Sequence, residues 1–304
     1  SPGKALAAEM RDRQHHQQEV KEFLAQAFGT APWQLNLPQG RGHETYLARS
    51  GQLACFIKLG ANLSRSRAMA ALGLTPEVLA SGRLADGVSL LVQAAIPGRS
   101  PTRQDYHAHL EQVAKIIQIM HHSPLLQSTL PAPLAQEFSA AGLSALEHIQ
   151  RRWLRCRPLV PQVAEYVDRS LEALKQQVQS FTGSGLVASH NDICNANWLV
   201  TEHGRWYLVD LEAMALDDPA LDIGATLWWY YPARLRPRFL EISGYAEDQA
   251  FARRMQVRMA MHCLHILLPR EQSFDPFSPE GFIAELVDFR AALAGAENPQ
   301  GYED

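Results

Sequence analysis

The hydrophobic pattern of this chain changes near residue 95. Before that point, short segments that alternate apolar and polar residues are separated by glycine-containing turns such as Ser50-Gly51 and Asp86-Gly87, a pattern typical of β-hairpins. After it, apolar residues recur at helical spacing over long segments. The chain has 304 residues, about twice the length of a usual single domain. We therefore expect an α+β, bilobal fold, with a small antiparallel β lobe at residues 1–95 and a larger, mainly helical lobe at residues 96–304.

The β lobe is expected to begin with a helix. Apolar residues recur at helical spacing between Val20 and Phe28, and Gly29 can end the helix. A second, short helix is expected at Ser64–Leu72. The expected strands are Trp33–Leu37, Thr45–Arg49, Leu53–Lys58, Glu77–Leu84 and Val88–Ala95.

The second lobe is expected to be built mainly from six helices. A short β segment, Leu186–Leu211, separates the third of them from the fourth. The expected helices are Arg103–His122, Leu143–Arg155, Val163–Phe181, Ala220–Tyr230, Gln249–Leu268 and Pro279–Leu293.

Composition argues against several classes of partner. The net charge is only −4 and the basic residues are scattered, which argues against nucleic-acid binding. The apolar stretches are too short to span a membrane, and the first residues contain no apolar signal-peptide core. The four cysteines lie far apart, which disfavours a disulfide framework or a zinc site. We expect a cytoplasmic protein with a small-molecule partner, and the oligomeric state stays open.

A hairpin is predicted inside the β segment. Trp198–Thr201 and Trp206–Val209 are apolar and flank His203-Gly204, which suits a two-residue turn. If the strands pair about this turn, Asn197 lies opposite Asp210, with Cβ atoms about 4.5–5.5 Å apart. A one-residue slip would still leave both side chains at the open end of the hairpin. Two oxygen ligands are thus expected at one place.

The polar residues of this segment suit phosphoryl transfer. That reaction needs a hard cation on the phosphates, oxygen ligands to hold it, and a carboxylate to orient the attacking hydroxyl. Asn197 and Asp210 suit the cation, Asp192 suits the hydroxyl, and His190 is placed to brace the loop by hydrogen bonds. Each residue alone is better explained as an ordinary turn residue. Their combined spacing is far more specific.

This combination resembles the aminoglycoside phosphotransferase and choline kinase family. The resemblance is tight over residues 189–224 and rests elsewhere on the order of the elements. It is carried by His190-Asn191-Asp192 with Asn197, by Val209-Asp210-Leu211-Glu212, and by Asp217-Asp218-Pro219 leading to Asp222. Asp217 stands where the family often has glycine, a tolerable change in a turn.

The resemblance implies a protein-kinase-like fold and an ATP-dependent or GTP-dependent kinase that uses Mg²⁺. It implies Asp192 as the catalytic base and Asn197 and Asp210 as the magnesium ligands. It assigns Asp218 and Asp222 to a structural segment that follows the metal strand.

Lys58 is the candidate residue for contacting the nucleotide. Alternation places Lys58 on the face of its strand opposite Cys55 and Ile57. In kinase-like lobes a lysine on the third strand contacts the α and β phosphates; a lysine capping an exposed strand is the simpler alternative. The other candidate nucleotide contacts are Gly40 and Gly42 over the phosphates and the backbone of Gln93 to Ala95 at the adenine.

One departure from the family concerns the acid that pairs with this lysine. The helix expected to supply a glutamate, Ser64–Leu72, has no acidic residue. Glu44 or Glu77 can substitute. If neither does, Lys58 is positioned differently or the lobe is incomplete.

Candidate contacts to the phosphate acceptor fall into two groups. Trp228 and Trp229 begin an aromatic run, and aromatic faces attract organic cations; at most two side chains of the run can line one pocket, and core packing is the better explanation for the others. Glu280, Glu285 and Asp288 lie on the last helix, where related antibiotic kinases often place acids, although a solvated face explains them more simply. We expect a small, amine-bearing acceptor, either aminoglycoside-like or like choline or thiamine.

Two alternative functions remain. The missing helix glutamate suggests a pseudokinase, or a nucleotide-binding module without turnover. A protein kinase is disfavoured, because no Asp-Phe-Gly and no Ala-Pro-Glu segment accompanies Asp210.

Overall fold

The computed structural model describes residues 1–36, 44–245, 248–271 and 276–301. It divides into two compact units. Residues 1–99 and 200–212 form one, which we call the sheet unit, and residues 100–199 and 213–304 form the other, which we call the helical unit. A lobe boundary after residue 95 remains our proposal; residues 200–212 group with the sheet.

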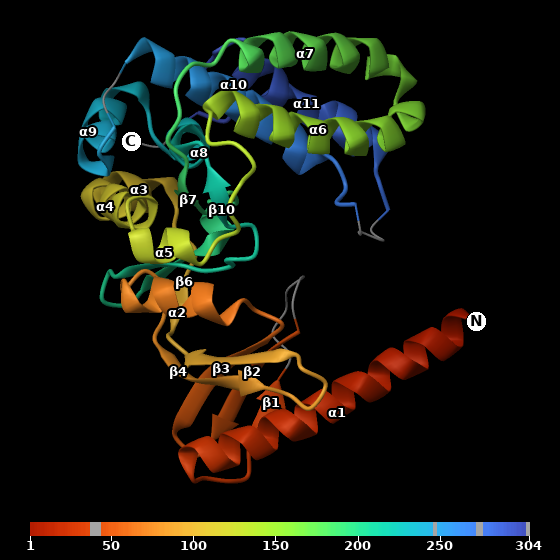
Figure 1. Cartoon of the computed structure of the whole chain (residues 1–304), viewed down its shortest axis with the longest axis vertical. Coiled ribbons are helices and arrows are strands. Elements are labelled where there is room, and N and C mark those ends of the chain that lie inside the picture. Colours follow the sequence, from red (N-terminus) through yellow and green to blue (C-terminus); the bar gives the residue numbers. More distant parts are fainter. Residues whose placement is uncertain (37–43, 246–247, 272–275, 302–304) are drawn as a thin grey trace. The chain divides into compact units, whose positions relative to one another are not determined.

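The sheet unit contains a five-stranded antiparallel sheet (Figure 1). Its strands lie in the order β1-β2-β3-β5-β4. Tight turns at Gly51 and Gly87, both with positive φ, connect β2 to β3 and β4 to β5. The strands span Gln34–Asn36 (β1), Thr45–Ser50 (β2), Leu53–Leu59 (β3), Val78–Arg83 (β4) and Ser89–Ala94 (β5).

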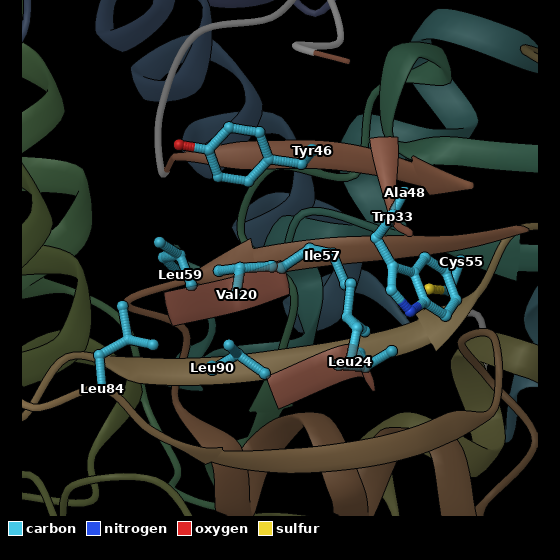
Figure 2. Packing of buried hydrophobic residues seen from close by; sticks show 11 residues of the cluster. Val20, Leu24, Trp33, Tyr46, Ala48, Cys55, Ile57, Leu59, Leu84 and Leu90 are labelled. Atoms are coloured by element: carbon cyan, nitrogen blue, oxygen red, sulfur yellow. The ribbon is translucent and has the colours of Figure 1, made fainter. Parts of the chain in front are cut away.

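Helix α1 (Pro2–Phe28) covers one face of this sheet. Val20 and Leu24 are fully buried against a cluster that includes Cys55 and Ile57 of β3 (Figure 2). The helix starts well before the segment that the sequence predicted. The prediction missed its first half because those residues are exposed and show no apolar stripe. The observed alternation in β3 places Lys58 on the face opposite α1, as expected.

Helix α2 (Leu63–Ala71) lies on the other side of the sheet from α1 (Figure 1). The strands β6 (Gly98–Arg99), β8 (Trp198–Thr201) and β9 (Trp206–Leu208) form a small separate sheet. The prediction of a two-residue turn between β8 and β9 is wrong. The Thr201 N–H donates to the Arg205 carbonyl at 2.9 Å and the Gly204 N–H to the Thr201 carbonyl at 3.0 Å, which defines a three-residue loop with Gly204 at positive φ.

The helical unit contains most of the helices. The single helix expected over residues 103–122 is two helices, because His109 takes a non-helical backbone conformation between them. Helices α5 and α9 were not predicted from the sequence. The elements are α3 (Arg103–Ala108), α4 (Leu110–His121), α5 (Pro124–Ser128), α6 (Phe138–Cys156), α7 (Pro161–Gln179), α8 (Pro219–Tyr230), α9 (Arg236–Ser243), α10 (Gln249–Leu267) and α11 (Pro279–Leu293), with 3₁₀ turns at Arg157–Leu159, Asn195–Asn197 and Ala233–Leu235.

Two short strands in this unit hold the polar loop of the sequence analysis. Strand β7 (Val187–Ser189) pairs antiparallel with β10 (Ala215–Asp217), and Ser189 faces Ala215. The loop that starts at His190 therefore leaves the small sheet beside the residues that lead into β10. In the part of the chain that the structure describes, every helix is too short or too polar to cross a membrane.

Candidate active site

The loop of residues 190–197 is held by the buried carboxylate of Asp222. Asp222 lies in the first turn of α8 and is fully buried. Its Oδ2 accepts the His190 backbone N–H at 2.8 Å, and its Oδ1 accepts the Asn191 backbone N–H at 3.0 Å. Asn191 has a positive φ of 67°, and its side chain donates to the Ala213 carbonyl at 3.1 Å. The positive φ lets the loop turn sharply here, and Asn is among the non-glycine residues that tolerate this conformation best.

His121 completes the support of Asp222. At the end of α4, its Nε2 lies 2.8 Å from Asp222 Oδ2, and its Nδ1 lies 2.7 Å from the Tyr245 hydroxyl. A carboxylate has no hydrogen to donate, so Nε2 of His121 is the donor. Burial raises the pKa of Asp222, but the hydrogen bond from His121 and the neighbouring His190 outweigh it and lower the pKa overall. The carboxylate is therefore ionised in the core.

Asn197 closes the loop onto Asp192. The Asn197 side-chain nitrogen donates to the Asp192 backbone carbonyl at 2.7 Å and to Asp192 Oδ2 at 3.0 Å. The Asp192 N–H in turn donates to His190 Nδ1 at 3.3 Å, the bracing contact that the sequence analysis assigned to His190. Because the nitrogen of Asn197 faces Asp192, the amide oxygen is the atom that is left for a cation.

Asp210 belongs to the sheet unit. It follows β9, is exposed, and has a positive φ of 58°. Its convergence with Asp192 and Asn197 stays a prediction. Among the described residues, no cluster of three or more His, Cys, Asp and Glu side chains is arranged to hold a metal. A carboxylate oxygen from Asp210 and an amide oxygen from Asn197 are hard ligands, and this donor set fits Mg²⁺.

Two arginines of α10 anchor the acids that precede α8. Asp218 is fully buried; it caps α8 by accepting the Ala220 N–H at 2.9 Å and accepts a hydrogen bond from Arg254 at 2.8 Å. Asp217 accepts two hydrogen bonds from the buried Arg258, at 2.8 and 3.0 Å. Asp217 is thus the acidic half of an ion pair and more than a turn residue that replaces glycine. The pairing fixes the segment between β10 and α8.

Lys58 forms an ion pair with Glu212. Both residues belong to the sheet unit, and the Lys58 side chain is 16% exposed. The substitutes considered from the sequence lie elsewhere: Glu44 contacts His16 and Tyr46, and Glu77 is exposed. The acid therefore comes from the residues that follow β9.

The structure describes only some of the remaining candidate nucleotide contacts. Gln93, in β5, donates from its side chain to the Pro76 carbonyl at 3.0 Å, and Ala95 follows the end of that strand. Gly40 and Gly42 lie outside the described residues.

Asp192 lines a cavity in the helical unit. The cavity has a volume of about 630 Å³. Trp229 and Tyr230 of α8 and Arg103 of α3 contribute to its wall. The Tyr230 hydroxyl accepts the Asn195 N–H at 2.8 Å, which ties the aromatic wall to the loop. A second cavity, of about 830 Å³, lies against Asn191 and is lined mostly by apolar side chains.

The aromatic run and the last helix place their candidate residues differently. Trp229 lines the cavity that contains Asp192, whereas Trp228 is buried and donates to the Ala296 carbonyl at 2.9 Å. On α11, Glu280 and Glu285 are exposed and Asp288 is half-buried, and burial raises the pKa of Asp288. Their roles toward an acceptor stay predictions.

Sequence reasoning missed four residues of this site: His121, Tyr245, Arg254 and Arg258. All four act through tertiary contacts. The only local signals were a histidine at the end of an apolar helical pattern and arginines in the middle of one, positions where a long polar side chain needs a buried partner.

The fold agrees with comparisons to known proteins. A model of the phosphotransferase enzyme family matches residues 49–256. The structure is similar to choline kinase from Streptococcus pneumoniae (TM-score 0.62, 17% identity, 92% of this chain and 99% of that one). It is also similar to AMP-bound spectinomycin phosphotransferase (0.65, 17%, 91% and 98%). A third similar structure is an ethanolamine kinase from Plasmodium vivax (0.61, 12%, 86% and 84%).

These similarities confirm the α+β, bilobal, protein-kinase-like fold expected from the sequence. The family model covers more than half of the chain. The chain belongs to the phosphotransferase enzyme family and is a small-molecule kinase that transfers a phosphoryl group to a hydroxyl.

Proposed function

We propose that the enzyme transfers the γ-phosphoryl group of ATP or GTP to a hydroxyl of a small, amine-bearing alcohol, with Asp192 as the catalytic base. The observation that carries the proposal is that Asp192 and Trp229 line the same cavity. Asp192 orients the acceptor hydroxyl and receives its proton, and the hydrogen bonds from Asn197 hold the carboxylate in place. The Glu212 partner of Lys58 removes the reason for proposing a pseudokinase.

The charges of the cavity disfavour an acceptor with several cationic groups. Among its described lining residues, Asp192 is the only acid, and Arg103 contributes one positive charge. Burial lowers the pKa of His262, a further lining residue, to about 4, so it is neutral at pH 7. An acceptor like choline or thiamine therefore fits this wall better than an aminoglycoside with several ammonium groups. The acids of α11 provide the alternative contacts that an aminoglycoside would need.

A nucleotide-consumption screen tests the proposed function. The acceptors are choline, ethanolamine, thiamine, aminoglycosides, other hydroxylated antibiotics and simple sugars. We expect turnover with a cationic alcohol. Nucleotide binding without turnover across the whole panel would contradict the proposal.

Replacement of Trp229 tests whether an aromatic face recognises the cation. We expect Trp229→Leu to raise the acceptor KM about 3- to 30-fold, because cation–π contacts contribute about 0.5–2 kcal/mol. Trp229→Phe is the matched control; it keeps an aromatic face and should stay closer to the wild type. The measurement is the initial rate against acceptor concentration. Equal KM values for the leucine and phenylalanine variants would rule out the aromatic contact.

Metal removal tests the cation proposed for Asn197 and Asp210. The bound Mg²⁺ would neutralise charge on the phosphates. We expect excess EDTA, or Asp210→Ala, to reduce turnover by at least about 100-fold. The melting temperature of the variant should fall by only about 2–4 °C, because Asp210 is exposed and its positive φ costs alanine about 1 kcal/mol. Added Mg²⁺ should rescue the EDTA-treated enzyme but not the variant. Full activity in EDTA would contradict the assignment.

A further inference from the structure

The contacts around Lys58 involve both α2, which has no acid, and the segment that follows β9. Residues 63–71 of α2 contain two arginines and no Asp or Glu. One of them, Arg65, is half-buried and points back to the segment that follows β9. The same segment supplies Glu212, which pairs with Lys58. Helix, acid and lysine are thus connected by a path that the sequence does not reveal.

Arg65 contacts two consecutive backbone carbonyls. Its Nη1 donates to the Leu211 carbonyl at 2.9 Å and to the Glu212 carbonyl at 3.3 Å. This nitrogen carries two hydrogens, so it can donate one to each carbonyl. These contacts restrict the backbone from which the Glu212 side chain extends.

Glu212 restricts Lys58 in turn. A lysine side chain has four rotatable carbons and about 2 kcal/mol of rotamer entropy to lose when it is fixed. The pair is shielded, with the Lys58 and Glu212 side chains 16% and 35% exposed. The ammonium has three donors, so one contact to Glu212 leaves two for phosphate oxygens.

We propose that Glu212 is the acid that positions Lys58 for the nucleotide phosphates, and that Arg65 of α2 is a positioning residue that acts by holding Glu212. The proposal rests on the nucleotide role proposed for Lys58. In this arrangement α2 supplies an arginine to the backbone beside the acid, instead of supplying the acid itself.

Calorimetric titration with ADP tests the chain of contacts. We expect Glu212→Gln to weaken ADP binding about 10-fold and Arg65→Ala about 3- to 10-fold. If Arg65 acts through Glu212, the double variant binds ADP no more weakly than Glu212→Gln within about 2-fold, because coupled residues are not additive. Arg67→Ala is the matched control: Arg67 lies on the same helix, contacts Ser81 and is exposed, and its removal should leave ADP affinity unchanged.

A further measurement separates this role of Glu212 from a role in holding the metal. The titrations are repeated in excess EDTA, where the same fold-losses are expected because Lys58 contacts the phosphates directly; a loss seen only with Mg²⁺ would show that Glu212 acts through the metal and would overturn the proposal. If Arg65→Ala does not fold, Arg65→Met replaces it, since methionine keeps an unbranched apolar side chain but has no hydrogen to donate to the two carbonyls.

The outcomes for the inference and for the proposed function are distinct. Wild-type affinity in Glu212→Gln, or fully additive losses in the double variant, would overturn the inference while leaving the kinase assignment intact. A wild-type protein that binds no ADP would overturn the proposed nucleotide site itself.

Discussion

Replacing Asp192 by asparagine should lower kcat by about 10²- to 10⁴-fold, the usual contribution of a general base, while the affinity for ADP stays within about 2-fold of the wild type. Asparagine has the size of aspartate, and its side-chain oxygen can still accept the hydrogen bond from Asn197, so the loop should keep its shape. The substitution removes the carboxylate that we propose takes the proton of the acceptor hydroxyl. Initial rates with a saturating acceptor and ADP titration measure the two effects separately.

Asp12→Asn is the control for the Asp192 variant. Asp12 lies in the exposed first half of α1, so the same acid-to-amide change there should leave both kcat and ADP affinity unchanged. Wild-type kcat in Asp192→Asn would show that another group accepts the proton. Loss of ADP binding together with activity would indicate that Asp192 supports the structure and is not the base.

Local signals predicted the elements whose ends are defined by their own residues. Helix α11 begins and ends where the sequence analysis placed it. Its start is defined locally, because Ser278 caps it by accepting the Gly281 N–H and Pro279 occupies the first turn. Helix α8 ends at Tyr230 as predicted and starts one residue earlier than predicted, at Pro219, where Asp218 is the cap. The position of Asp192, five residues before Asn197, likewise predicted that both belong to one tight loop.

Long-range pairing could not be predicted in the same way. The acid beside Lys58 was sought on α2 or at Glu44 and Glu77, yet Glu212 provides it from a segment far along the chain. Arg258 could not be predicted as the partner of Asp217, because the residues around Asp217 do not indicate which distant side chain will pair with it. Such pairs depend on which surfaces the fold brings together, and one sequence does not contain that information in any local pattern.

The register of the β8–β9 hairpin illustrates a smaller limit. His203-Gly204 suits a two-residue turn as well as it suits the end of a three-residue loop. The choice depends on side-chain contacts: the Thr201 hydroxyl accepts the Arg205 N–H at 3.1 Å, which satisfies that donor without a carbonyl partner across the strands. Turn composition alone therefore leaves a one-residue uncertainty in pairing.

Asp222→Asn should strongly destabilise the helical unit. The carboxylate accepts hydrogen bonds from His121 and from the backbone N–H groups of His190 and Asn191. An amide in the same position must direct its NH₂ group at one or more of these donors. A buried donor without an acceptor, together with loss of a buried charge, costs about 3 kcal/mol or more. For a chain of this size, we expect the melting temperature to fall by about 6–12 °C.

The same substitution should also change the response to acid and the rate. The folded-state pKa of Asp222 is lowered, so this residue stabilises the fold above the unfolded pKa of about 4 and that stability is lost as the pH falls through the folded value. The variant should therefore lose less stability than the wild type as the pH falls below about 4. Because Asp222 sets the position of the loop that carries Asp192, we also expect kcat to fall by about 100-fold. Glu111→Gln removes an exposed carboxylate that pairs with Arg238 on the surface and is the matched control; a melting temperature for Asp222→Asn as high as that of this control would show that the buried carboxylate does not hold the loop.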